Sequence, residues 1–374
     1  MKKKICLLLY SAVHYRKKIY SLIDENYDCE FNFHLSPTMC EQFDTGLLNG
    51  QVNKYEIKSF KGLEYTGDIL KKTREDFDTY IVGANPRNIA VWLFCIKIRL
   101  FHPQKRIFFW THGWYGKESI MESLFKRIFY RLPHGIFLYG NYARNLMIER
   151  GFNPDKLFVI HNSLDYDKQL ELRNKAYKTA VYYNHFQNEF PTIIFIGRLK
   201  PVKQLDLLIE AVDLLIKKGE KYNIVFVGDG PMKPILSEIA VQKGIESNVW
   251  FYGECYDEST NAELIYNAEI CVAPGNVGLT AIHTLMFGTP VITHDNFPYQ
   301  MPEFESINPG VTGDFFKQGD VQSLAETIQK WESQHINERE QIRNNCYLEI
   351  DTQWNPDFQI NVIKKSLKGN EELS

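Results

Sequence analysis

Short apolar runs alternate with helical patterns in the second half of the chain. Residues 193–196 are an unbroken β-branched and aromatic run, as expected of a parallel strand that is buried on both faces. Over 205–215, apolar residues recur at steps of three and four, and Gly219 follows where a helix would end. Later apolar runs at 223–227 and 249–252 are each followed by glycine. This alternation predicts an α/β fold built on parallel strands.

The first half repeats the pattern, and a polar segment separates the two series. Its predicted strands are 5–10, 106–110, 135–139 and 157–160. A loose, Lys- and Tyr-rich stretch at about 165–189 is the candidate hinge. With 374 residues, the chain is long enough for two cores. We predict an N-terminal domain over 1–185 and a C-terminal domain over 186–354, with a helix at about 355–374 that packs back on the first domain.

Two cations follow the first strand of the second domain. Arg198 comes directly after Gly197, and Lys203 follows in the same loop. In open α/β sheets, ligands bind beyond the carboxyl ends of the strands. A guanidinium fork with an ammonium point charge suits a diphosphate, whereas two solvated loop charges are the plain alternative. A Gly-rich turn and a helix that begins near Leu279 and Thr280 would add unpaired backbone N–H groups at the same edge.

These motifs resemble the retaining nucleotide-sugar glycosyltransferases of family 4, closely over about 190–330 and in outline elsewhere. That family has the GT-B fold, in which two Rossmann-like domains with parallel sheets face each other across a cleft. The resemblance implies that Gly197, Arg198 and Lys203 bind the donor diphosphate, and that Arg198 and Lys203 are catalytic. It also implies a wider donor-binding set, which comprises Gly228, Gly230, Gly253, Cys255, Asn276, Gly278, Leu279, Thr280, His283, Glu303 and Glu305.

Two positions depart from the family's pattern. Its signature places a Glu on either side of the Gly-rich turn, where this chain has Gly275 and His283. Gly275 offers only backbone atoms, so the donor sugar is held otherwise or lacks the usual hydroxyl pattern, as a deoxysugar would. A neutral His283 can accept a hydrogen bond from a ribose hydroxyl, or it is a helical His with a core hydrogen bond. An acidic loop offers Glu303 or Glu305 to the sugar or ribose, and the sequence leaves that choice open.

Loops of the first domain carry the candidate acceptor-side residues. The loop after the first strand is basic and includes His14 and Arg16, where the family usually has glycines. It suits an anionic acceptor or the donor phosphates, and a solvated helix start is the alternative. His112 ends a predicted strand, and related enzymes have a His beside the reacting sugar there, so the resemblance implies a catalytic role; a capping His is the alternative. Asn141 lies at a similar strand end.

Charge and hydropathy indicate where in the cell the protein acts. Residues 1–190 hold 28 Lys and Arg against 20 Asp and Glu, and the rest hold 15 against 26, so the first domain is the basic one. No run of 18 apolar residues occurs, which predicts a cytoplasmic protein. Segments 89–106 and 124–131 mix aromatic residues with cations. This mixture favours either peripheral contact with the anionic inner face of the cell membrane or a helix packed on the sheet. The seven scattered cysteines are predicted to be reduced thiols.

Motifs of other enzyme classes find little support. Asp-x-Asp occurs at 76–78 and 165–167, but neither follows a strand of the donor domain. Because Arg198 and Lys203 already supply positive charge at the predicted diphosphate site, we expect neither a metal nor a cofactor. A P-loop is absent, and no G-x-G-x-x-G follows the first strand.

The resulting hypothesis is a retaining transferase that moves a hexose or deoxyhexose from a nucleoside-diphosphate sugar to a glycan or a polyprenyl-diphosphate-linked glycan. By family association, the expected product is a bacterial surface polysaccharide, such as O-antigen, capsule or exopolysaccharide. Nucleic acid is not an expected partner. Because both signature acids are missing, a catalytically inactive nucleotide-sugar-binding or scaffolding homologue is the main alternative. A sugar phosphorylase or another GT-B enzyme is the second.

Overall fold

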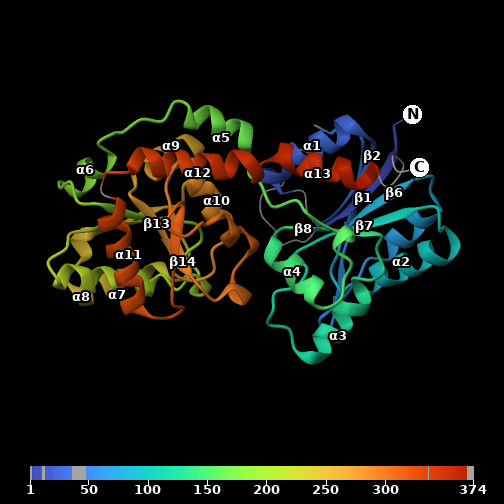
Figure 1. The fold of residues 1–374 in the computed structure, drawn as a ribbon, viewed down its shortest axis with the longest axis horizontal. Coiled ribbons are helices and arrows are strands. Elements are labelled where there is room, and N and C mark those ends of the chain that lie inside the picture. The colour runs from blue at the N-terminus through green and yellow to red at the C-terminus, as the bar shows by residue number, and fades with distance from the viewer. Residues whose placement is uncertain (1, 11–12, 36–47, 336, 369–374) are drawn as a thin grey trace. The chain divides into compact units, whose positions relative to one another are not determined.

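The computed structural model describes residues 2–10, 13–35, 48–335 and 337–368, and it divides into two compact units (Figure 1). Unit 1 comprises Met1–Asp165 together with Pro356–Ser374, and unit 2 comprises Tyr166–Asn355. Each unit is built on its own parallel sheet, so the predicted α/β class with two Rossmann-like halves is confirmed.

Unit 1 contains a seven-stranded parallel sheet with the order β3-β2-β1-β6-β7-β8-β9. Its strands are β1 (Lys4–Leu9), β2 (Asp28–Leu35), β3 (Gln51–Glu56), β6 (Thr79–Gly83), β7 (Arg106–Thr111), β8 (Gly135–Leu138) and β9 (Leu157–Val159). The order reverses between β1 and β6, and such a reversal opens a crevice at the carboxyl edge of the sheet. A separate antiparallel ribbon consists of β4 (Lys58–Phe60) and β5 (Leu63–Tyr65).

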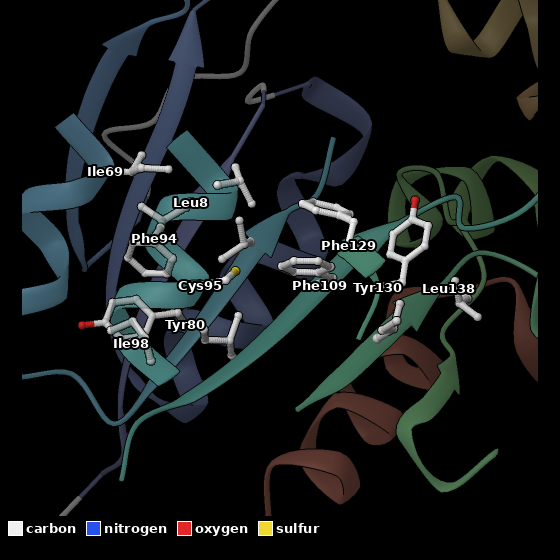
Figure 2. Packing of buried hydrophobic residues seen from close by; sticks show 14 of the residues in the cluster. Leu8, Ile69, Tyr80, Phe94, Cys95, Ile98, Phe109, Phe129, Tyr130 and Leu138 are labelled. Atoms are coloured by element: carbon white, nitrogen blue, oxygen red, sulfur yellow. The ribbon is translucent and has the colours of Figure 1, made fainter. Parts of the chain in front are cut away.

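Helices cover both faces of this sheet, because successive residues of a strand point to opposite sides. They are α1 (Lys17–Asn26), α2 (Ile89–Phe101), α3 (Ile120–Phe129), α4 (Asn141–Glu149) and α13 (Pro356–Lys368), with the 3-10 turns η1 (His14–Arg16), η3 (Gly67–Arg74) and η4 (Pro154–Lys156). Leu7 of β1 belongs to a core shared with α1 and α13. Leu8 belongs to the opposite core with α2. Figure 2 shows part of this second core, where the rings of Phe109 and Phe129 stack with centroids 4.7 Å apart.

The helix α13 returns to unit 1 after the chain has passed through unit 2. It packs against α1 and β9. Gln359 donates to the carbonyl of His161 at 2.9 Å and accepts from the Ser163 hydroxyl at 2.8 Å. Ile360 and Ile363 are buried in the same core as α1. A segment from the end of the described chain is therefore an integral part of the first unit.

Unit 2 contains a six-stranded parallel sheet with the order β12-β11-β10-β13-β14-β15. The strands are β10 (Thr192–Ile196), β11 (Asn223–Val227), β12 (Val249–Gly253), β13 (Ile270–Ala273), β14 (Val291–His294) and β15 (Gly313–Phe316). The helices are α7 (Asp206–Lys217), α8 (Lys233–Lys243), α9 (Glu258–Asn267), α10 (Leu279–Met286), α11 (Val321–His335) and α12 (Arg339–Gln353), with η5 (Pro201–Lys203), η6 (Glu246–Asn248), η7 (Phe297–Tyr299) and η8 (Pro302–Ser306). The order reverses between β10 and β13, which marks this edge for ligands.

The chain enters unit 2 after Asp165, earlier than the boundary near residue 185 that the sequence predicts. Two helices, α5 (Tyr166–Arg173) and α6 (Val181–Phe186), follow this point. Both pack on α9, and α5 also packs on α10. The segment predicted as a loose hinge is therefore part of unit 2. Its helices were hidden because they bury little beyond Gln169 and Tyr182, and their outer positions are polar.

The longest helices in the described part of the chain, α11 and α12, have 15 residues each. A helix that spans a bilayer needs about 20 mostly apolar residues. No helix among the described residues meets that requirement.

Candidate active site

The loop after β10 holds the predicted diphosphate cations, next to the reversal of strand order in unit 2. Gly197 and Arg198 follow the strand directly, and η5 ends in Lys203. Arg198 is exposed at the carboxyl edge, whereas Lys203 is partly buried. Burial lowers the pKa of the Lys203 ammonium, and the carboxylate of Glu303 opposes that shift. One cation is therefore exposed, and the other forms part of the wall of the site.

Glycines allow the loops after β10 and β11 to approach each other closely. A Cβ atom on Gly228 would lie 2.0 Å from the carbonyl oxygen of Gly197, and one on Gly230 would lie 2.5 Å from that of Leu199. Gly228 also has a φ of 136°, which side chains rarely tolerate. Its amide donates to the carbonyl of Gly253 at 2.7 Å. The turns after β10, β11 and β12 thus form one continuous backbone surface.

Two further residues of the predicted donor-binding set, Gly253 and Cys255, lie in the turn that ends β12. Cys255 is partly buried, and its thiol lies 3.5 Å from the carbonyl oxygen of Asp257. The structure brings these residues to the same strand edge as Gly228 and Gly230, as the sequence predicted.

The turn after β13 packs against η5 from the other side. The amide of Gly275 donates to the carbonyl of Lys203 at 2.8 Å, and the Lys203 ammonium donates to the carbonyl of Asn276 at 2.7 Å. A Cβ atom on Gly275 would lie only 2.1 Å from the carbonyl oxygen of Val202. No side chain fits at Gly275 unless η5 moves, so the family's first Glu is incompatible with the observed backbone.

The amino end of α10 lies at the same edge. Gly278 is its N-cap residue, and Leu279 and Thr280 form its first turn. The hydroxyl of Thr280 donates to the carbonyl of Ile196 at 2.8 Å, which ties the helix to the end of β10. The unpaired N–H groups and the positive dipole end of α10 are therefore added to the two cations of the β10 loop.

Of the two acidic candidates in η8, Glu303 lies at the site. Its side chain is 2% exposed, and it is close enough to Lys203 to act on the pKa of that residue. Glu305 is more exposed. The amide of Met301 donates to the carbonyl of Val277 at 3.2 Å, which holds η8 against the Gly-rich turn. The structure thus distinguishes two residues that the sequence could not.

A carboxylate lies beside the second departure from the family's pattern. The Nε2 atom of His283 lies 2.8 Å from Oε1 of Glu258, the first residue of α9. Gln169 of α5 donates to the same oxygen at 2.8 Å. Burial alone would raise the pKa of Glu258, but His283 and Gln169 outweigh it and lower that pKa to about 2. Sequence reasoning missed Glu258, although its place directly after the N-cap residue Asp257 was a signal.

Unit 1 holds a cavity of about 920 Å³ where its own strand order reverses. Leu9 and Gly83, which end β1 and β6, line it, as do Trp110 and His112 at the end of β7. The β4-β5 ribbon and α3 provide further walls, the latter through Phe125. The cavity therefore occupies the position in unit 1 that the cation loop occupies in unit 2.

His112 lies in this cavity among aromatic rings. Its ring centroid is 4.7 Å from that of Tyr139 and 6.0 Å from that of Tyr115. Its Nδ1 atom is buried and has no hydrogen-bond partner among the described residues. Burial, reinforced by the positive charges of Arg16 and Lys126, lowers the pKa of His112 to about 4. The ring is therefore neutral at pH 7.

The other acceptor-side predictions have mixed outcomes. Arg16 of η1 lines the cavity and donates to the hydroxyl of Tyr139 at 2.5 Å. The side chain of His14 lies outside the described part of the structure. Asn141 is exposed at the start of α4, and the cavity wall at this strand end is Tyr139 instead. The aromatic lining was missed, although Trp110 and Tyr139 both stand at carboxyl ends of predicted strands.

Within the described ranges, no group of three or more His, Cys, Asp or Glu side chains is arranged to hold a metal ion. Asp76 of the first Asp-x-Asp motif is exposed and pairs with Lys4 at 2.9 Å.

Comparison with known proteins gives one family match within the second unit and several partial matches to individual proteins. Residues 183–348 match the family described as glycosyl transferases group 1. The chain is 26% identical over 189 residues to the poly(ribitol-phosphate) alpha-N-acetylglucosaminyltransferase of Staphylococcus aureus, which covers 50% of this chain and 34% of that protein. It is 25% identical over 236 residues to an uncharacterized 41.2 kDa protein in the cps region of Klebsiella pneumoniae, which covers 62% and 60%. Both matches span less than two thirds of the relatives' own length.

A solved structure shares the fold over nearly the whole chain. HepE of Anabaena, crystallised in complex with UDP, superposes with a TM-score of 0.70 at 17% identity and covers 98% of this chain and 99% of its own. The matched family region lies within the second unit and includes its glycine turns and cation loop. Residues 183–348 thus match the group 1 glycosyl transferase family, and the chain as a whole has the two-unit GT-B fold.

Proposed function

We propose that this protein transfers a sugar from a nucleoside-diphosphate sugar to a hydroxyl group of a glycan or lipid-linked glycan, with retention at the anomeric carbon. The observation that carries this proposal is the packing of η5 against the turn before α10, where Lys203 donates to the carbonyl of Asn276 at 2.7 Å. Arg198, Lys203 and the first turn of α10 gather positive charge suited to a diphosphate. The complex of HepE with UDP supports a nucleotide as the ligand of this fold.

In the proposed reaction, the main barrier is the departure of the nucleoside diphosphate. Negative charge builds on the β-phosphate as the glycosidic C–O bond breaks. Arg198, Lys203 and the amino end of α10 then stabilise the transition state more than the bound donor. Each charge-assisted hydrogen bond contributes about 1.5 to 3 kcal/mol. Because these groups neutralise the leaving group, we propose an enzyme that needs neither metal nor cofactor.

The acids near the site suggest how the donor is held. Glu303 is buried beside Lys203, so it is our candidate acceptor of hydrogen bonds from the sugar. The pair of His283 and Glu258 is our candidate for the ribose hydroxyls. Because Gly275 cannot carry an acid, a deoxyhexose with fewer hydroxyls fits the site as well as a hexose. In unit 1, a neutral His112 can form a hydrogen bond with the reacting sugar.

We assign the acceptor to the cavity of unit 1, which is large enough for a small glycan. Two relatives support a cell-surface product: one is a poly(ribitol-phosphate) alpha-N-acetylglucosaminyltransferase, and another is a protein of a cps region. We therefore propose a role in a bacterial surface polysaccharide, such as O-antigen, capsule or exopolysaccharide.

A contact with the anionic inner face of the cell membrane is part of the proposal. The outer face of α2 exposes Ile89, Leu93, Ile96, Leu100 and Phe101, and α3 exposes Ile120, Met121, Leu124, Phe125 and Ile128. We call these residues the apolar face. Its two halves adjoin, because the ring of Trp92 on α2 lies 4.7 Å from that of Phe125 on α3. The exposed cations Arg127 and Arg131 lie beside it, as in segments that bind anionic lipid.

Nucleotide binding by the full chain tests the donor site. A thermal shift with UDP, dTDP, GDP, CDP or ADP is expected to reveal one preferred nucleotide, since a ligand at about 100 times its Kd adds roughly 2.7 kcal/mol of stability. We expect Arg198→Ala with Lys203→Ala to abolish the shift and to lower the transfer rate by about 10- to 100-fold or more. Lys218→Ala, which removes an exposed cation at the end of α7, is the matched control and should change neither.

Near-normal turnover by the double variant would exclude these cations from the donor site. Nucleotide binding without transfer from any donor sugar would favour the alternative function, an inactive nucleotide-sugar-binding or scaffolding homologue. Transfer from any donor sugar excludes that alternative.

A further inference from the structure

Arg16 brings a positive charge into the wall of the unit 1 cavity, where its closest neighbours are aromatic. Its guanidinium carbon lies 5.2 Å from the ring centroid of Tyr139, 5.7 Å from that of Tyr15 and 5.8 Å from that of Trp110. One terminal nitrogen donates to the hydroxyl of Tyr139 at 2.5 Å. The Tyr139 hydroxyl is neutral at pH 7, because burial raises its pKa well above the usual range.

The carboxylates that line the cavity are engaged with other groups. Glu118 accepts from the ammonium of Lys126 at 2.7 Å and from two backbone amides. Glu122 closes the capping box at the start of α3. Glu64 accepts from the side chain of Asn85 at 3.0 Å. Among the described residues, Arg16 therefore has no carboxylate partner in the cavity.

Buried hydrogen-bonding atoms without a partner mark the same wall. They are Nε of Arg16, Nε1 of Trp110 and Nδ1 of His112, for which the described part of the chain provides no acceptor or donor. Trp110 is only 4% exposed. An unsatisfied buried polar group costs about 1 to 3 kcal/mol, and more when the group is charged. Three such atoms belong to residues that line one cavity, so this wall carries unsatisfied polar groups although the closest neighbours of Arg16 are aromatic.

The charge of Arg16 specifies the kind of ligand. A partly buried cation with neutral partners is unfavourable in an empty cavity and becomes favourable when an anion enters. A guanidinium group binds the oxygens of phosphates and carboxylates strongly. We propose that the unit 1 cavity binds an anionic group of the acceptor, and that Arg16 recognises it. This inference rests on the proposed function, which assigns the cavity to the acceptor.

The acceptor is then a glycan that carries a phosphate, a diphosphate or a carboxylate close to the hydroxyl that is extended. A lipid-linked diphosphate and an acidic sugar share this chemistry. The donor diphosphate is not the anion, because unit 2 already provides Arg198, Lys203 and the amino end of α10 for it.

Anion binding by the full chain tests this proposal in a background that lacks the donor cations, Arg198→Ala with Lys203→Ala. The probes are inorganic pyrophosphate and methyl glucuronide, with methyl glucoside as the neutral match of the glucuronide. We expect at least one anion to raise the Tm and the glucoside to leave it unchanged. A shift with pyrophosphate alone points to a lipid diphosphate, and a shift with the glucuronide alone points to an acidic sugar. Adding Arg16→Met should remove the shift, whereas Arg16→Lys should retain part of it.

Arg16→Met also separates recognition from folding. Met replaces the charge with an apolar chain of similar length but removes the donor to the Tyr139 hydroxyl, so the Tm without ligand is measured beside each binding experiment. In the otherwise natural chain, the Kd for UDP should change less than about twofold, whereas a loss of about tenfold (1.4 kcal/mol) would assign Arg16 to the donor and overturn the proposal. An anion shift that survives Arg16→Met, or no shift with either anion, would overturn it as well. A natural chain that binds no nucleotide would instead overturn the proposed function.

Discussion

Gly275 and His283 occupy the two positions where the family's acids are missing, and their surroundings differ. At Gly275, the carbonyl oxygen of Val202 lies where a side chain would begin, 2.1 Å from a Cβ atom. At His283, a carboxylate arrives from Glu258 on α9 at 2.8 Å. At Gly275 the site therefore lacks the family's acid, whereas at His283 an acid is present but comes from another helix. Candidate donors should therefore be varied first in the transferred sugar and only then in the ribose of the nucleotide.

His112 predicts a pH dependence of stability that needs no substrate. Its pKa is lowered to about 4 in the folded protein, whereas an unfolded His titrates near about 6.5. Between these values the unfolded chain binds a proton that the folded protein does not, so stability falls as the pH falls. Between about pH 7 and about pH 4.5, we expect the free energy of unfolding of His112→Gln to fall by about 2 kcal/mol less than that of the natural chain. Urea denaturation measures both values.

Other buried histidines cancel in this comparison. His134 also has a pKa lowered to about 4, mainly by burial, and it is present in both proteins. Equal losses of stability in the variant and the natural chain would show that His112 takes up its proton as readily folded as unfolded.

At the scale of elements, α2 and α3 differ in how much of their apolar surface they bury. The inner side of α2 is buried through Phe94, Cys95 and Ile98, while its outer side remains apolar and exposed. In α3, only Phe129 is buried. The reading of segment 89–106 as a helix packed on the sheet is therefore confirmed, and the membrane reading stays a prediction that concerns the exposed side of α2.

The apolar face predicts binding to anionic vesicles. Ile120, Met121 and Leu124 are 89%, 75% and 55% exposed, so changing all three to Ser should leave the fold intact. Each side chain that enters a bilayer contributes on the order of 1 kcal/mol. We expect the triple variant to sediment with phosphatidylglycerol vesicles at least about tenfold less than the natural chain, and binding to phosphatidylcholine vesicles to be weaker in both.

Val241→Ser with Leu348→Ser is the matched control, because these side chains are 59% and 63% exposed on unit 2. Equal sedimentation of the triple variant and this control would remove the membrane role. If the natural chain forms a dimer, and the triple variant is a monomer while the control variant is not, the apolar face binds a second copy of the chain instead.

At the scale of the whole molecule, the return of α13 makes unit 1 depend on a distant segment. Ile360 and Ile363 are buried in its core, and Gln359 is bonded to His161 and Ser163. We expect a chain that ends after Asn355 to show a lower unfolding temperature for unit 1 and an unchanged one for unit 2, measured by calorimetry. The loss of several buried side chains at about 1.5 to 3 kcal/mol each is large against the stability of a domain.

Lys368→Ala, at an exposed position of α13, is the control for this truncation and should affect neither transition. If unit 1 unfolds at the same temperature without α13, the helix contributes nothing to its stability.

Much of this architecture could be predicted from sequence, because strands such as β1, β10 and β11 are continuous apolar runs and helices such as α7 have a clear period of apolar residues. The cation loop could be predicted for the same reason, since Arg198 and Lys203 directly follow such a run. What could not be predicted depends on packing between distant segments. Glu258 reaches His283 only because α5, α9 and α10 pack together. Arg16 and Tyr139 are 123 residues apart, and no local pattern signals their contact.

The place of α13 in the chain also sets an order of assembly during synthesis. The ribosome makes most of unit 1 first, then all of unit 2, and only afterwards the helix that completes the core of unit 1. Unit 2 can therefore reach its native state while the earlier-made unit still lacks a core helix. We infer that nascent unit 1 exposes the surface later covered by α13 throughout the translation of about half the chain, which makes it the part of the protein most exposed to chaperones and proteases.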